Sequence, residues 1–183
     1  MEIDYSLKIG IIGKSKSGKS CLIQKYFTGI FESEYYKTIF LKVHYGYFCS
    51  THGNLELELY DISCDEFGMK QLPLLINKMN GLILIVDGTE DNFSEMLSQW
   101  KLYIDSINQV IPILGLINKS DLMNKKQFQS IPKMKFPLFT ISLKNCKNYQ
   151  YPIITLVQTI LSLPILFSTY MYRLQALYSK ETL

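Results

Sequence analysis

A glycine-rich segment near the N-terminus, residues 13–20, constrains the fold of this chain more than any other feature. Its sequence is Gly13-Lys14-Ser15-Lys16-Ser17-Gly18-Lys19-Ser20, a glycine and four free positions followed by Gly-Lys-Ser. Residues 7–12 before it predict a buried strand, and residues 21–27 after it predict a helix. Glycines let successive N–H groups turn inward, and the helix N-terminus adds further unpaired N–H groups. This context favours a phosphate-binding loop over an ordinary turn with a solvated lysine.

Composition limits the class of protein. The chain has 183 residues, of which 48% are hydrophobic and 19% charged, as expected of one globular domain. Its net charge of +3 is too small to indicate a nucleic-acid partner. The four cysteines are far apart and form no Cys-x-x-Cys pair, which favours reduced cytosolic thiols over disulfides or zinc. The acidic N-terminus does not have the features of a secretory signal.

Strand and helix patterns alternate along the chain and predict a doubly wound α/β sheet. Residues 81–86 and 111–117 are unbroken apolar runs, which are typical of parallel strands covered on both faces. Between them, apolar residues recur at helical spacing from Phe93 to Ile107. Residues 137–141 predict the last strand of this sheet.

Residues 40–48 and 55–60 flank a polar turn and predict an antiparallel hairpin at one sheet edge. Residues 62–73 come next as a predicted loop that leads into a short helix. Ligands of doubly wound sheets bind beyond the carboxyl ends of the strands. The residues that lie at such ends are Gly13, Asp61, Asn118 and Ser142.

A second motif, Asn118-Lys119-Ser120-Asp121, comes directly after one of the apolar strands. Guanine presents two neighbouring donors, its ring N–H and its exocyclic amine, and the Asp121 carboxylate can accept from both. Adenine would place an acceptor there, so this site would select guanine. The Lys119 stem can lie over the ring, and Asn118 can bond the base and neighbouring loops.

With these motifs in this order, the chain resembles the Ras superfamily of small GTPases over nearly its whole length, and residues 81–100 look most similar to its Rab branch. The resemblance implies a fold of the P-loop NTPase type. This is a mostly parallel six-stranded sheet with one antiparallel edge strand and helices on both faces. Residues 1–164 would form the GTPase domain and residues 165–183 a C-terminal extension.

The resemblance also implies GTP or GDP with Mg²⁺ as ligands. Ser20, Thr38 and Asp61 would hold the metal, and Lys19, Thr38 and Asp65 would occupy catalytic positions. Phe31 would pack against the guanine edge, and Tyr35 would close over the γ-phosphate. The implied nucleotide-binding residues are Gly13, Ser15, Lys16, Ser17, Gly18, Lys19, Ser20, Cys21, Phe31, Tyr35, Thr38, Cys64, Asn118, Lys119, Asp121, Ser142, Leu143 and Lys144, the last three closing the pocket through backbone N–H groups.

The second switch departs from the family pattern Asp-x-x-Gly-Gln-Glu. Cys64 replaces the glycine whose N–H meets the γ-phosphate, and Asp65 replaces the glutamine that orients the attacking water. Lys16 adds a charge to the phosphate loop. Prolines between Asp121 and Ser142 predict that the helix of this span is truncated. These departures affect turnover more than nucleotide binding.

The C-terminal part is apolar, with no charged residue from Asn148 to Tyr172. Residues 153–163 fit the family's last helix, and we expect the residues after Pro164 to fold back or to meet a partner. A membrane span is the alternative. The chain has no terminal cysteine for prenylation, and we expect a cytoplasmic protein that can reach membranes through a partner.

The sequence supports two functional hypotheses. The first is a guanine-nucleotide switch with slow GTP hydrolysis in intracellular trafficking or signalling. The second is a non-hydrolysing pseudo-GTPase that acts as an interaction module. In either case, effector and regulatory proteins would bind from Phe31 to Phe40 and from Ile62 to Pro73.

Overall fold

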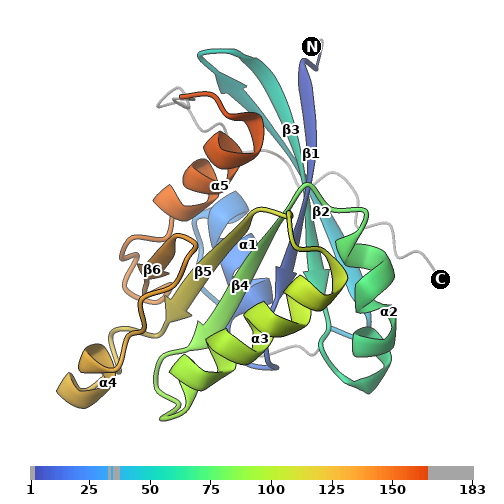
Figure 1. The fold of residues 1–183 in the computed structure, drawn as a ribbon. Coiled ribbons are helices and arrows are strands. Elements are labelled where there is room, and N and C mark those ends of the chain that lie inside the picture. The colour runs from blue at the N-terminus through green and yellow to red at the C-terminus, as the bar shows by residue number, and fades with distance from the viewer. Residues whose placement is uncertain (1–2, 33, 35–37, 165–183) are drawn as a thin grey trace.

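A six-stranded sheet with the order β2-β3-β1-β4-β5-β6 forms the centre of the molecule (Figure 1). The structure is a computed structural model that describes residues 3–32, 34 and 38–164. Every neighbouring pair of strands is parallel except the β2–β3 hairpin at one edge, which confirms the predicted fold class. The strands are β1 (Tyr5–Ile12), β2 (Leu41–Ser50), β3 (Gly53–Ile62), β4 (Gly81–Asp87), β5 (Ile113–Asn118) and β6 (Leu138–Thr140).

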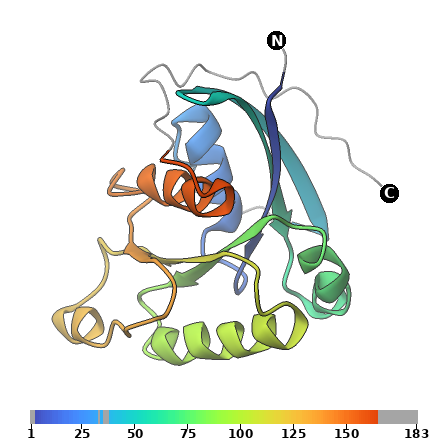
Figure 2. The ribbon, with the colours of Figure 1, turned by 45° about the horizontal axis from the view of Figure 1, so that its top comes forward.

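Helices cover both faces of the sheet (Figure 2). Helices α1 and α5 pack on one face, where Ile23 and Leu156 share an apolar core. Helices α2 and α3 pack on the other face, where Leu72 and Leu97 share a second core. All residues of β4 are buried between these layers, as its unbroken apolar sequence predicts. The helices are α1 (Lys19–Thr28), α2 (Glu66–Ile76), α3 (Phe93–Ile107), α4 (Lys125–Gln129) and α5 (Tyr151–Leu161).

Two helices differ in extent from the prediction. Helix α2 begins at Glu66 and has 11 residues with Pro73 inside it, where the sequence pattern suggested mostly loop. Proline disfavours a helix interior, but Leu72 and Ile76 on either side of it are fully buried on the second core, and this burial outweighs the local preference. Helix α5 ends at Leu161, where Ser162 turns left-handed at φ 53°, and so stops short of the predicted end at residue 163.

The remaining elements agree with the predictions. Helix α4 has only 5 residues, as the prolines of that span suggested. No helix among the described residues is long and apolar enough to cross a membrane. The predicted C-terminal extension, residues 165–183, and Tyr35 of the predicted site lie outside the described residues.

Candidate nucleotide-binding site

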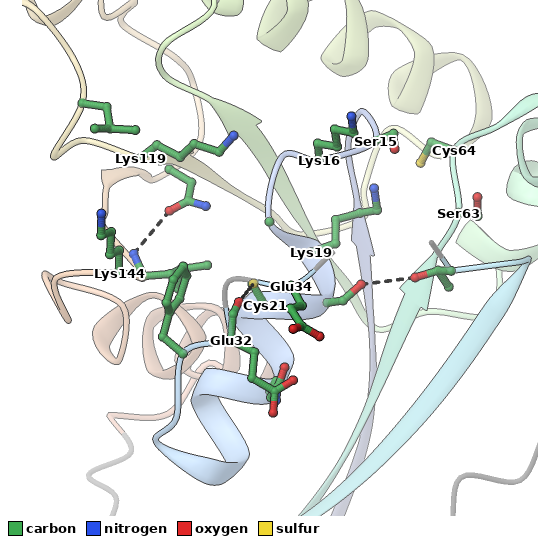
Figure 3. A pocket seen from close by; sticks show the side chains of 18 of the residues that line it. Ser15, Lys16, Lys19, Cys21, Glu32, Glu34, Ser63, Cys64, Lys119 and Lys144 are labelled. Carbon is green, nitrogen blue, oxygen red and sulfur yellow. Dashed lines mark hydrogen bonds between the residues drawn. The ribbon is translucent and has the colours of Figure 1, made fainter. Parts of the chain in front are cut away.

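A cavity of about 400 Å³ lies beyond the carboxyl ends of β1, β3, β5 and β6, and its size suits a small-molecule ligand. Figure 3 shows Lys16 and Cys64 at one end of the cavity and Lys119 and Lys144 at the other. The predicted site residues that line it are Ser15, Lys16, Gly18, Lys19, Ser20, Cys21, Phe31, Thr38, Cys64, Asp65, Asn118, Lys119, Asp121, Leu143 and Lys144. Gly13, Ser17, Asp61 and Ser142 are buried and do not line the cavity.

The two glycines of the phosphate loop are needed for its shape. Gly13 has φ 144°, and an added Cβ would lie 2.1 Å from the Ile85 carbonyl oxygen on β4. Gly18, the N-cap of α1, has φ 109°, and its added Cβ would lie 2.3 Å from Asn118 Nδ2. Any side chain at either position would push the loop away from the strands that hold it.

The Lys19 side chain runs back along the inside of the phosphate loop. Its ammonium donates hydrogen bonds to the carbonyl oxygens of Gly13 (2.8 Å) and Lys14 (3.0 Å), and the residue is only 8% exposed. A cation is therefore held at the mouth of the loop by two neutral carbonyls. Lys16 lies nearby in the left-handed region at φ 65°, a conformation that costs a lysine more than a glycine.

Ser20, Thr38 and Asp61, the predicted metal set, meet at one point although they come from α1, the loop before β2 and the end of β3. Asp61 Oδ2 accepts from Ser20 Oγ at 2.6 Å and from Thr38 Oγ1 at 2.9 Å. Asp61 is 1% exposed, and its Oδ1 has no hydrogen-bond partner among the described residues. Hard oxygen ligands of this kind are those that Mg²⁺ takes, so the residues present fit that ion.

The Asn118 side chain joins two loops around the cavity. Its Nδ2 donates to the Ser17 carbonyl oxygen at 3.0 Å, and its Oδ1 accepts from the Leu143 N–H at 3.4 Å. The residue is 4% exposed. Asn118 therefore ties the phosphate loop to the β6–α5 connection.

Asp121 lies at the rim of the cavity and is oriented by Ser142. The Ser142 hydroxyl accepts from the Asn145 N–H at 3.0 Å and donates to Asp121 Oδ1 at 2.6 Å. The Ser142 N–H is bonded to the Lys147 carbonyl. With the Leu143 N–H bonded to Asn118, two of the three backbone donors predicted to close the pocket are used inside the protein.

Comparisons with known proteins agree with this geometry. A family model described as "Ras of Complex, Roc, domain of DAPkinase" matches residues 8–121, more than half of the chain. This chain belongs to the Ras superfamily of small GTPases. It is 26% identical over 174 residues to "Ras-related protein RabY" of Dictyostelium discoideum. This alignment covers 87% of this chain and 72% of that protein. It is also 26% identical over 170 residues to "GTP-binding protein ypt1" of Schizosaccharomyces pombe, at 87% and 82% coverage. These relatives support the Rab-like assignment.

In this Ras-superfamily domain, Cys64 lies at the end of the cavity that Ser15 and Lys16 line. Its thiol donates weakly to the Ile62 carbonyl oxygen at 3.7 Å. Burial raises the pKa of the Cys64 thiol more than the Gly13 backbone and the Lys19 ammonium lower it. The thiol is therefore a neutral group at neutral pH, and it takes up space where the family has only a glycine backbone.

Asp65 caps helix α2. Its Oδ1 accepts from the Gly68 N–H at 3.0 Å, and its backbone is extended as an N-cap requires. Gly68 is packed so closely that an added Cβ would lie 1.9 Å from the Ser63 carbonyl oxygen. The carboxylate thus has a structural partner at the position where the family has its water-orienting glutamine. A catalytic role for Asp65 stays a prediction.

Because of this cap, we expect Asp65→Ala to lower the free energy of unfolding by about 1 kcal/mol. Asp65→Asn should keep most of the stabilisation that the cap provides, because asparagine is also a good N-cap. Glu66→Ala is the matched control, since Glu66 is the next residue and forms an exposed ion pair with Lys70. Urea denaturation of the variants measures the difference. Equal losses for Asp65→Ala and Glu66→Ala would contradict the capping role.

Sequence reasoning missed three acids near the site. Asp87, at the end of β4, pairs with the Lys119 ammonium and also accepts from Thr89 N–H and Oγ1. Burial alone would raise the pKa of Asp87, but the bonds from Lys119 and Thr89 outweigh it and lower the pKa. Its signal in the sequence was a carboxylate directly after a buried strand. Glu32 and Glu34 also line the cavity, and no local pattern indicates them.

Proposed function

We propose that this chain is a Rab-like guanine-nucleotide switch with slow intrinsic GTP hydrolysis, working in the cytoplasm in intracellular trafficking or signalling. The observation that carries the proposal is the meeting of Ser20, Thr38 and Asp61 at one point. Thr38 belongs to the segment between α1 and β2, so a ligand at this point would couple that segment to the phosphate loop. Such a coupling is what a nucleotide-dependent switch requires.

The residues of the cavity suit a nucleoside triphosphate. The N–H groups of the phosphate loop and the Lys19 ammonium would bind the outer phosphates and stabilise the charge that develops during phosphoryl transfer. Mg²⁺, held by Ser20, Thr38 and Asp61, would neutralise part of the phosphate charge. At the other end of the cavity, Asp121 would accept from the two guanine donors.

Two features support slow hydrolysis. The Asp65 carboxylate is engaged by the Gly68 N–H, and as an ionised group it can only accept hydrogen bonds, whereas an amide would both donate and accept. The Cys64 thiol takes up space at the phosphate end of the cavity. These same features favour the second candidate, a pseudo-GTPase whose bound nucleotide mainly stabilises an interaction module.

Partner proteins would bind the first and second switch segments, residues 31–40 and 62–73. Ile39 is 88% exposed and Phe67 58% exposed, although both are large apolar residues. Phe67 stacks edge-on against Phe40 with ring centroids 5.2 Å apart. An apolar surface that joins both segments supports recognition of effectors or regulators there.

Nucleotide content after purification, followed by single-turnover phosphate release, tests the proposed function. We expect bound GDP or GTP and slow release. Cys64→Gly with Asp65→Gln should raise the hydrolysis rate, at the expense of the α2 cap, with little change in GDP affinity. Wild-type protein that retains GTP through the whole assay, together with no gain in the double variant, would instead support the pseudo-GTPase.

A further inference from the structure

Charge is distributed unevenly along this chain. Between Asp121 and Glu181 the sequence contains no Asp or Glu. The same stretch contains Arg173 and the lysines at positions 125, 126, 133, 135, 144, 147 and 180. The small net charge therefore conceals an acidic part and a basic part. Four of the lysines, Lys125, Lys126, Lys133 and Lys135, lie on α4 and on the loop that joins it to β6, and we call them the α4 patch.

A buried residue of α4 determines that Lys125 and Lys126, the α4 half of this patch, face solvent. Gln127 is 7% exposed, and its amide donates to the Thr89 carbonyl oxygen at 2.8 Å. It also forms a capping box with Asn124 at the start of α4. With Gln127 turned inward, Lys125 and Lys126 are exposed to solvent.

The loop after α4 presents its lysines in a similar way. Ile131, Met134 and Phe136 are partly buried and pack against the second core. Lys133 and Lys135 lie between these residues and are exposed. A loop anchored by alternate apolar side chains holds its charged side chains on one outer surface.

The lysines of the α4 patch form no ion pair with any described residue. The ion pairs that the described residues do form involve other lysines, such as Lys70 with Glu66 and Lys101 with Asp105. The patch therefore presents uncompensated positive charge.

The place of the patch in the fold indicates the shape of its partner. Helix α4 projects from a corner of the molecule beyond β6, and α2 and β2 lie on the far side in both views (Figures 1 and 2). The sheet order also puts β6 and β2 at opposite edges. A flat surface can contact such a corner and leave α2 and β2 free.

We propose that the α4 patch docks this protein on membrane surfaces that contain anionic lipid. Lysines near such a surface are attracted by its negative potential. Phe128 on α4 is 40% exposed and adds an apolar side chain of the kind that inserts at the headgroup boundary. The net charge of +3 is too small to indicate a nucleic-acid partner, so a lipid surface is the better match.

Vesicle co-sedimentation of the full chain tests this proposal, using phosphatidylcholine vesicles with and without phosphatidylserine. We expect binding only when phosphatidylserine is present, and release when salt rises from about 0.1 M to about 0.5 M. Changing Lys125, Lys126, Lys133 and Lys135 to Gln should weaken binding on the order of 10³-fold. Lys133→Gln with Lys135→Gln, which leaves α4 intact, should weaken binding about 30-fold.

The matched control changes Lys8, Lys42, Lys70 and Lys78 to Gln, which removes the same charge from other exposed positions. It should bind vesicles as the wild type does, and thermal unfolding checks that every variant is folded. Equal losses in patch and control variants would mean that net charge alone is responsible, and would overturn the proposal. Wild-type protein that ignores phosphatidylserine but binds RNA through the patch would also overturn it.

Discussion

Replacing Lys19 with Ala should weaken GDP and GTP binding by about 10²–10³-fold, because removing one member of a partly buried charge pair costs several kcal/mol. The Lys19 ammonium is fixed by two backbone carbonyls at the mouth of the phosphate loop. We expect the Lys19 ammonium, held in this position, to interact with the outer phosphates of a bound nucleotide. Titration with a fluorescent GDP analogue measures the change in affinity.

Lys14→Ala is the control for Lys19→Ala. Lys14 lies in the same loop, but it is exposed and pairs with Glu90 at 2.8 Å. Its loss should change nucleotide affinity only slightly. Lys19→Gln separates the effect of charge from that of structure, because the glutamine amide can still donate to the loop carbonyls. We expect this variant to bind nucleotide almost as poorly as Lys19→Ala. If Lys19→Ala bound nucleotide as tightly as Lys14→Ala, the role assigned to Lys19 would be refuted.

The second large effect concerns base selection. Asp121→Asn should weaken guanine-nucleotide binding on the order of 10²-fold or more, because one guanine donor would then face an amide donor. It should at the same time favour xanthine nucleotides, whose exocyclic oxygen accepts a hydrogen bond. Competition between GDP and xanthosine diphosphate on the wild type and the variant measures the exchange of preference.

The environment of Asp121 makes this prediction specific. Ser142 Oγ already accepts from the Asn145 N–H, so its own proton is directed to Asp121 Oδ1. In the Asp121→Asn variant the amide oxygen would keep that bond, and the amide NH₂ would face the base. Ser142→Ala should therefore weaken the discrimination in the variant. Wild-type protein that binds ATP as well as GTP would show that Asp121 does not read the base.

Local patterns determined the fold class. Unbroken apolar runs such as residues 81–86 are typical of strands buried between two layers, and the spacing of apolar residues in α3 matches a single covered face. The phosphate loop was equally clear, because Gly13 and the Gly18-Lys19-Ser20 sequence lie within eight consecutive residues, between a predicted strand and a predicted helix. These features depend on residues close together in sequence, so they can be recognised without the structure.

Other features depend on residues far apart in the chain, and only the tertiary structure decided them. Burial on the second core extends α2 through Pro73, against local preference. Asp65 could be aligned with a family glutamine, but its bond to the Gly68 N–H appears only once α2 is known to begin at Glu66. The exposed α4 patch likewise depends on which neighbours are buried, since a run of lysines does not show where its side chains point. The sequence names the residues of a site, whereas packing decides which of their atoms are already engaged and which remain for a ligand.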